Sequence, residues 1–247
     1  MPRNPYSYGS SLSFGPGPLS PAIKGLIGAN VVAFVAQLVV PSLTRAFGLL
    51  PAAALGEMHV WQLATYMFLH AGVLHLLFNM LALWMFGTEL ERIWGTRYFL
   101  KFYFVTGVGA ALLTVVFSLL PFAAARELYV STVIGASGAV YGLLLAYALY
   151  YPERPIYLYL IFPIPAKYFV IIVGLLAFYS SVGETGGVAS ATHLGGLLVA
   201  LAYLKSGRVH PIAELKYRYL KWKINRTRKK FDVYSGGRAN DWDRHVH

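Results

Sequence analysis

The sequence contains no cysteine among its 247 residues. This absence excludes disulfide bridges, a thiol nucleophile and thiolate metal sites, because each of them needs a cysteine sulfur. A His-Glu-x-x-His motif is also missing, which excludes the zinc proteases built on that motif. Chemistry that depends on a cysteine sulfur or on this zinc motif is therefore excluded.

Charged residues are scarce as well. Asp, Glu, Lys and Arg make up 13% of the chain, whereas 57% of it is hydrophobic and the mean hydropathy is +0.55. Soluble domains contain about 25% charged and about 45–50% apolar residues. So few charges cannot coat a water-soluble globule, and much of the surface must face lipid. The length suits one membrane domain with short tails.

Only ten acidic residues are present, and no predicted membrane span contains an aspartate. An intramembrane aspartyl dyad is therefore excluded. Carboxylates or paired charges inside the spans would favour a transporter or channel, and these are missing too. Residues 1–20 hold one charge, Arg3, and no apolar run behind a basic start. We therefore predict a disordered leader rather than a cleavable signal peptide.

Six apolar stretches predict an all-α membrane protein. A bilayer core of about 30 Å requires roughly 20 apolar residues in a helix. The predicted spans are 23–40, 69–86, 98–120, 132–151, 166–181 and 188–204. The apolar residues 155–165, which are broken by prolines, precede the fifth span. The chain then divides into a leader (1–20), a six-span domain (21–205) and a basic tail (206–247).

The net charge of +11 could indicate nucleic-acid binding, but its position argues otherwise. Ten Lys and Arg residues lie between residues 205 and 230, where Glu214 is the only acid. A basic block directly after a span is typical of topology signals and of contacts with anionic lipid headgroups. We expect both termini to be cytoplasmic and the tail to bind anionic headgroups, not nucleic acid. The alternative is a solvated tail that only fixes orientation.

Polar side chains inside lipid are costly, so they mark candidate functional sites. Ser137 lies about six residues into the fourth predicted span, among Gly135, Gly138 and Gly142. Glycine before the serine lets backbone N–H groups stand open around its oxygen. Taken alone, this segment could equally be a Gly/Ser seam for helix packing.

Two further polar clusters lie in other spans. His193 is a titratable base in the sixth span, and Gly196 follows it by three residues. His75 and Asn79 are four residues apart in the second span, so both lie on one helix face. Taken alone, the first could be a packing histidine and the second a polar seam between helices.

The three clusters together supply the parts of acyl-transfer chemistry. A serine is a nucleophile, a histidine is a general base, and a His/Asn pair can donate hydrogen bonds to an oxyanion. The acid nearest to His193 in sequence is Glu184, nine residues earlier in a loop. A third triad member is therefore not expected, and the sequence predicts a Ser137–His193 dyad.

These residues resemble the motifs of the rhomboid family of intramembrane serine proteases. The segment 135–138, Gly-Ala-Ser-Gly, matches the Gly-x-Ser-Gly nucleophile motif of that family. His75 and Asn79 match its His-x-x-x-Asn element, and His193 matches the histidine of its last span. The resemblance covers roughly residues 20–205 and implies a six-transmembrane helical bundle of rhomboid type with both termini cytoplasmic.

The resemblance implies a role for each of these residues. Ser137 would be the nucleophile and His193 the general base. The oxyanion hole would be formed by His75, Asn79 and the backbone N–H of Ser137. Supporting roles would fall to Gly135, which shapes the loop that presents the serine, to Tyr141, which packs against the imidazole, and to Gly138 and Gly196.

Other positions carry weaker implications. Trp61 and Gln62 stand where many family members have Trp-Arg, so Gln62 is a departure from the pattern. His70 would order the mouth of the cavity. The Gly-rich loop 182–187 would cap the site, and the fifth span, 166–181, would move to admit substrate.

The resemblance implies an intramembrane serine endopeptidase that cuts single-span membrane proteins near the outer face. It implies no cofactor and no metal. Two alternatives remain: a catalytically inactive rhomboid-like protein that binds membrane clients, and a polytopic transporter. We expect a multi-pass protein of a cell membrane, of the bacterial or archaeal inner-membrane type.

Overall fold

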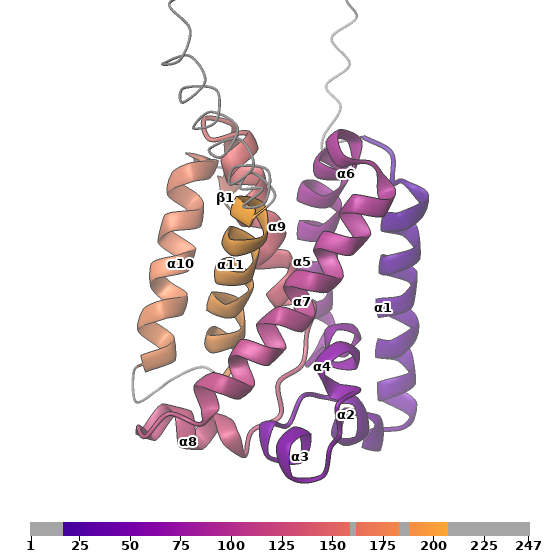
Figure 1. The fold of residues 1–247 in the computed structure, drawn as a ribbon. Coiled ribbons are helices and arrows are strands. Elements are labelled where there is room, and N and C mark those ends of the chain that lie inside the picture. The colour runs from indigo at the N-terminus through magenta and orange to yellow at the C-terminus, as the bar shows by residue number, and fades with distance from the viewer. Residues whose placement is uncertain (1–16, 159–161, 183–187, 207–247) are drawn as a thin grey trace, which may run out of the picture. The chain divides into compact units, whose positions relative to one another are not determined.

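Helices make up most of the structure (Figure 1). The computed structural model describes residues 17–158, 162–182 and 188–206. Residues 1–16 of the predicted leader, residues 183–187 of the predicted cap loop and residues 207–247 of the predicted tail lie outside this part. The expectations about the leader, the cap loop and the tail therefore stay predictions.

The helices and strands follow one another in two groups along the chain. Before the candidate serine lie α1 (Pro21–Val39), α2 (Ser42–Phe47), α3 (Pro51–Gly56), α4 (Gln62–Thr65), the 3₁₀ turn η1 (Tyr66–Phe68), α5 (Val73–Ala82), the π-helical turn η2 (Leu83–Gly87), α6 (Thr88–Trp94), α7 (Thr96–Ser118) and α8 (Ala123–Tyr129). From the serine onward lie α9 (Ser137–Tyr150), β1 (Pro155–Leu158), β2 (Phe162–Pro165), α10 (Ala166–Val182) and α11 (Val188–Ser206).

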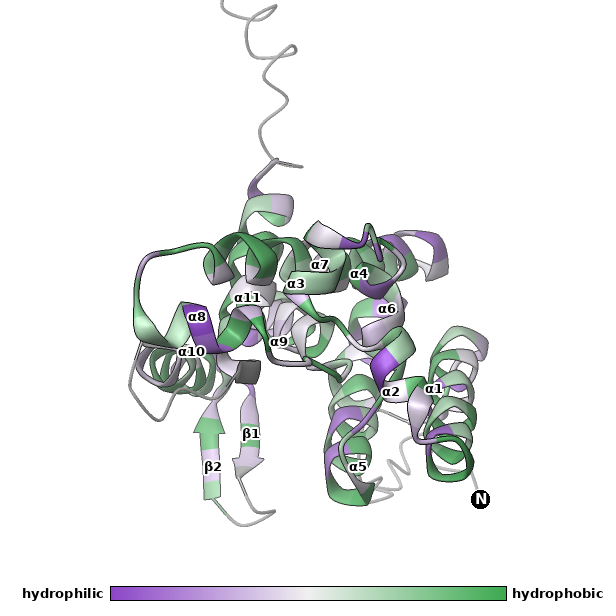
Figure 2. Cartoon of the chain, turned by 90° about the horizontal axis from the view of Figure 1, so that it is seen from below, coloured by the Kyte–Doolittle hydropathy of each residue, from purple (hydrophilic) through white to green (hydrophobic). Residues whose placement is uncertain are grey.

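Within the described residues, three helical stretches are long and apolar enough to cross a membrane. They are α1, the continuous stretch Val73–Trp94 and α7. The outward side chains of Val32, Leu38 and Val39 on α1 are 67–76% exposed, and hydrophobic colour covers the outer faces of several helices (Figure 2). Soluble surfaces rarely carry such continuous apolar areas. The prediction of a helical membrane protein is therefore confirmed.

Two further apolar helices are shorter. α9 has 14 residues and α10 has 17. At 1.5 Å per residue, 14 residues extend only about 21 Å, less than a bilayer core of about 30 Å. The count of six spans and the cytoplasmic placement of both termini stay predictions.

The start of the fourth predicted span is wrong. The sequence predicted a helix from residue 132, but the helix begins at Ser137. The preceding residues are not helical, and Val133 exchanges two backbone hydrogen bonds with Leu49, at 2.8 and 2.9 Å. A short apolar run does not distinguish a strand from a helix by its periodicity. Ser137 therefore lies in the first turn of α9 rather than six residues into a helix.

α9 packs closely against α7 because both helices carry small residues at the contact. A Cβ atom added to Gly138 would lie 2.9 Å from the side chain of Ala110, and one added to Gly142 would lie 2.9 Å from Thr106. Residues larger than glycine would push these helices apart. The core thus holds α9, which carries Ser137, firmly in place.

The segment between α1 and α5 folds against the bundle. α2, α3 and α4 lie at the end of the bundle opposite α6 (Figure 1). Leu49, Gln62, Tyr66 and Met67 in this segment are fully buried. The segment therefore contributes to the core beside the candidate site, where its apolar sequence had indicated a loop in the interface or against the bundle.

Candidate active site

Ser137 and His193 lie within hydrogen-bond distance of each other. The Oγ atom of Ser137 is 2.8 Å from Nε2 of His193, although 56 positions separate them in the chain. The serine begins α9 and the histidine lies in the first half of α11. When Nε2 carries no proton, the hydroxyl donates to it, which is the arrangement needed to activate a serine.

The imidazole of His193 is held by an aromatic ring. Tyr141 stacks on it with ring centroids 4.2 Å apart and an angle of 5° between the planes. Tyr141 lies one helical turn after Ser137, so one face of α9 carries both the hydroxyl and the ring. The stack restricts the orientation of the imidazole.

Backbone contact between α9 and α11 brings the pair together. A Cβ atom on Gly196 would lie 2.0 Å from the carbonyl oxygen of Gly138, closer than any side chain can approach. Position 196 therefore requires glycine. Gly138 follows Ser137 directly and Gly196 is one turn after His193, so this contact fixes the two helices next to the candidate pair.

A threonine pair forms a second tie to α11, which the sequence did not predict. Thr114 on α7 and Thr192 on α11 are both buried, and their hydroxyl oxygens are 2.8 Å apart. Thr114 also donates to the carbonyl oxygen of Ala110 at 2.8 Å. Its single hydroxyl proton is then used, so Thr192 donates to Thr114. In the sequence, the only indication of this contact was Thr192, a polar residue directly before His193.

Gly135 adopts a backbone conformation that favours glycine, with φ of +128°. Its N–H donates to the carbonyl oxygen of Tyr66 at 2.9 Å. A Cβ atom at this position would lie 2.8 Å from the ring of His75. The loop before Ser137 therefore passes directly over the His75 imidazole, and only glycine allows this approach.

The hydrogen bonds of His75 assign its proton. The N–H of Ala71 donates to Nδ1 of His75 at 3.3 Å, so Nδ1 acts as an acceptor. In a neutral imidazole, the proton then sits on Nε2. A Cβ atom on Gly135 would lie 2.9 Å from this Nε2. The geometry thus directs an N–H donor of His75 toward the backbone beside Ser137.

Asn79 is buried on the same helix one turn later. Its Nδ2 donates to the carbonyl oxygen of His75 at 2.9 Å, so one of its two N–H bonds is used within α5. His75 thus lies next to the loop of Ser137, whereas this hydrogen bond of Asn79 stays within its own helix.

His70 lies beside these residues. Its ring centroid is 5.1 Å from that of His75, with an angle of 65° between the planes. Its backbone N–H donates to Oε1 of Gln37 at 2.9 Å. Within the described residues, no group of three or more His, Asp or Glu side chains could hold a metal ion.

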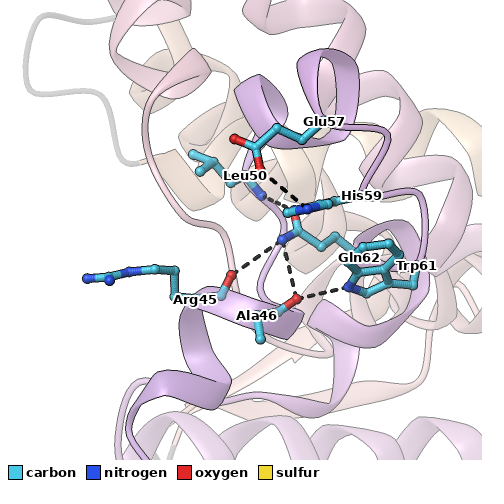
Figure 3. Close-up of polar contacts among 7 residues, drawn as sticks. All are labelled: Arg45, Ala46, Leu50, Glu57, His59, Trp61 and Gln62. Carbon is cyan, nitrogen blue, oxygen red and sulfur yellow. Dashed lines mark hydrogen bonds and ion pairs between the residues drawn. The ribbon is translucent and has the colours of Figure 1, made fainter.

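Gln62 ties the segment between α1 and α5 together (Figure 3). Its Oε1 accepts from the N–H of Leu50 at 3.0 Å, and its Nε2 lies 3.4 Å from the carbonyl oxygens of Arg45 and Ala46. The indole N–H of Trp61 also donates to Ala46, at 2.9 Å. The side chain of Gln62, which is shorter than arginine, therefore makes contacts within this segment at a position where arginine is common in the family pattern.

Comparisons with known proteins show which family the chain is similar to. A family model of the rhomboid domain matches residues 57–207, more than half of the chain. Rhomboid protease GluP of Bacillus subtilis (strain 168) is 34% identical over 153 residues, which cover 62% of this chain and 27% of that protein. The mitochondrial rhomboid protein 1 of Saccharomyces cerevisiae is 32% identical over 139 residues, which cover 55% of this chain and 38% of that protein.

Rhomboid protease AarA of Providencia stuartii is 29% identical over 157 residues, which cover 58% of this chain. The chain spans 27% to 56% of the length of these three relatives. The region matched by the family model contains every residue of the candidate site. The chain belongs to the rhomboid family.

Proposed function

We propose that this protein is an intramembrane serine endopeptidase that uses a Ser137–His193 dyad. The observation that carries the proposal is the 2.8 Å approach of Ser137 Oγ to His193 Nε2 between two apolar helices. Relatives named rhomboid proteases, from Bacillus subtilis and Providencia stuartii, support peptide-bond hydrolysis as the activity.

The dyad performs the reaction in two steps. His193 Nε2 takes the hydroxyl proton as Ser137 Oγ attacks the carbonyl carbon of the scissile peptide bond. The C–N bond breaks, and the proton passes from His193 to the leaving amine. Water then attacks the acyl ester with His193 again as base, which releases the new carboxyl group and restores the serine hydroxyl.

Hydrogen-bond donors around Ser137 stabilise the oxyanion that forms in both steps. The first N–H groups of an α-helix have no partner within the helix, and Ser137 begins α9. Its own N–H and the Nε2–H of His75 therefore supply two donors. The second N–H of Asn79 supplies a third. In a site with little water, such donors act more strongly than in bulk solvent.

The substrates we propose are single-span membrane proteins that reach the dyad from the lipid beside α10. The comparisons support action in a membrane, but mitochondrial and chloroplastic relatives occur among the matches. They therefore do not support restricting the protein to a bacterial or archaeal inner membrane. Contacts of the basic tail with anionic headgroups belong to residues outside the described part and stay predictions.

Covalent labelling of the purified protein by a fluorophosphonate tests the proposal. We expect wild-type protein to be labelled and the Ser137→Ala variant to remain unlabelled, because the probe reacts with an activated serine. A second assay follows cleavage of a single-span substrate in liposomes. Equal labelling of both proteins would contradict the assignment of Ser137. Labelling without any cleavage of single-span substrates would contradict the proposed substrate class.

A further inference from the structure

The β1–β2 hairpin extends sideways from the helical bundle. Figure 2 looks along the helices and shows both strands running outward beside α9 and α10. The strands are antiparallel, and Pro155 pairs with Pro165 at the end nearest the helices. From the sequence, these residues were only an apolar stretch broken by prolines.

The root of the hairpin is fixed to α9 and α10. β2 continues directly into α10, and the N–H of Ala166 donates to the carbonyl oxygen of Arg154 at 3.0 Å. Ile156 and Ala166 are buried in the core. The Arg154 guanidinium lies 3.4 Å from a Glu89 carboxylate oxygen, and the Tyr147 hydroxyl, as its hydrogen-bond partner, raises the pKa of Arg154. The two strands are therefore held in a fixed position relative to the N-terminal end of α10.

The outer part of the hairpin exposes large apolar side chains. Phe162 is 61% exposed and Tyr157 is 53% exposed. This surface continues along α10, where six large apolar residues are 47–75% exposed: Ile171, Ile172, Leu175, Leu176, Phe178 and Tyr179. The exposed face of α10 in a membrane protein contacts lipid, and the hairpin extends that face at one end.

Prolines remove hydrogen-bond donors from the outer edge of the hairpin. In an antiparallel pair, alternate residues direct their N–H groups away from the partner strand. Proline is tolerated at those outward positions because it has no N–H. Within the described part of β2, Pro163 and Pro165 are alternate residues, and they take these positions. The edge therefore lacks the row of donors that makes an open strand costly to desolvate and prone to pairing.

Neither water nor the hydrocarbon core suits this element. A two-stranded hairpin is marginal in water, and its exposed Phe162 and Tyr157 add unfavourable apolar surface. Open sheet edges do not occur in the hydrocarbon region, because their remaining polar groups find no partner there. The headgroup region offers both apolar contact and water, and aromatic side chains are enriched in it.

The basic residues at the root of the hairpin also favour a position in the headgroup region. Arg154 precedes β1, and Lys167 follows β2 by two residues, beside the half-exposed ring of Tyr168. Lys167 also pairs with the Glu153 carboxylate at 2.5 Å, and its side chain remains 37% exposed. Long basic side chains extend to headgroup phosphates while aromatic rings lie at the boundary of the acyl chains. We propose that the β1–β2 hairpin lies in the phospholipid headgroup region and holds the N-terminal end of α10 at the membrane surface. This inference does not depend on the proteolytic activity.

Single-cysteine spin labels test the proposed depth, because the chain has no cysteine of its own. The test position is Phe162→Cys in β2, and Tyr157→Cys in β1 is a second, independent position. A free water-soluble nitroxide in the surrounding buffer gives the aqueous limit. Leu175→Cys, at 63% exposure on α10, reports the lipid core. Each full-length variant is reconstituted in phosphatidylcholine/phosphatidylglycerol liposomes at high lipid dilution.

Collision rates with oxygen and with a water-soluble nickel complex give the depth of each label. We expect the oxygen-to-nickel ratio at positions 162 and 157 to lie between the ratio of the free nitroxide in buffer and the ratio at position 175. A ratio equal to that of the free nitroxide would place the hairpin in water and overturn the proposal. A ratio equal to that at position 175 would place it in the hydrocarbon and also overturn it. Dipolar broadening at position 162 that persists on lipid dilution would show that a second copy, not lipid, covers the hairpin.

Discussion

Gly196 on α11 faces the carbonyl oxygen of Gly138 on α9 so closely that an added Cβ atom would lie only 2.0 Å from it. Ser137 precedes Gly138, and His193 is one turn before Gly196. The distance between the serine and the histidine therefore depends on the direct contact of two helix backbones.

Gly196→Ala should strongly reduce cleavage. The methyl group forces α11 away from α9, and a displacement of about 1 Å in an active site can lower the rate about 10²-fold. Gly25→Ala is a matched control, because nothing lies within 4 Å of an added Cβ in α1. Cleavage rates and far-UV circular dichroism are compared in the same liposomes. Wild-type activity in Gly196→Ala would show that the contact does not set the Ser137–His193 distance.

Ser137→Ala and His193→Ala should each abolish cleavage of a single-span substrate. Each change removes one end of the 2.8 Å contact while leaving a smaller side chain that fits the same space. Both variants should remain helical and elute as wild-type protein does. Appreciable turnover by either purified variant would refute the dyad.

His75→Ala and Asn79→Ala should each lower the cleavage rate less than loss of Ser137 or His193 does. Loss of one oxyanion donor typically lowers the rate about 10²–10³-fold, and we expect the smaller end because several donors share the charge. The kcat should fall more than KM rises, since the hydrogen bonds belong to the transition state. A change confined to KM would argue against this role for either residue.

Activity should rise with pH as His193 loses its proton. Only the neutral imidazole accepts the serine proton, so the protonated enzyme is inactive. The rate should therefore fall as the pH decreases through the pKa of the His193 imidazole, while the fold, followed by circular dichroism, stays unchanged. A pH–rate profile that is flat from pH 4 to 8 would exclude histidine as the base.

Gln62→Ala should lower stability by about 1–3 kcal/mol, because the N–H of Leu50 loses its acceptor within a partly buried segment. Arg45→Ala is the control: only its carbonyl oxygen takes part in these contacts, and Figure 3 shows its guanidinium extending away from them. Unfolding in detergent, followed by circular dichroism, compares the two variants. Equal midpoints for Gln62→Ala and wild-type protein would show that its contacts do not stabilise the segment.

The sequence predicted the candidate site better than it predicted the elements around it. Ser137, His193 and Tyr141 could be grouped because polar residues in apolar spans are few and their motif spacing is specific. The extended approach to Ser137 was missed, since residues 132–136 are as apolar as a helix. Its cause is the pairing of Val133 with Leu49, a partner 84 positions away that no local pattern reveals.

Other features were missed because they depend on contacts between distant segments. The Thr114–Thr192 hydrogen bond joins two helices 78 positions apart. The hairpin was hidden because proline normally argues against a strand, whereas here it occupies outward edge positions. Gln62 was recognised only as a departure from a family pattern, and its contacts required the folded segment.

The loop before Ser137 is held at two points, by the paired backbones of Leu49 and Val133 and by the hydrogen bond from Gly135 to Tyr66. Tyr66 is itself anchored, because its hydroxyl donates to the carbonyl oxygen of Gly107 on α7 at 2.8 Å. In the proposed role of Ser137 as nucleophile, such a support leaves the serine little need to rearrange when substrate binds. Conformational change during turnover must then be confined to other elements, and the serine acts as the fixed reference point against which they move.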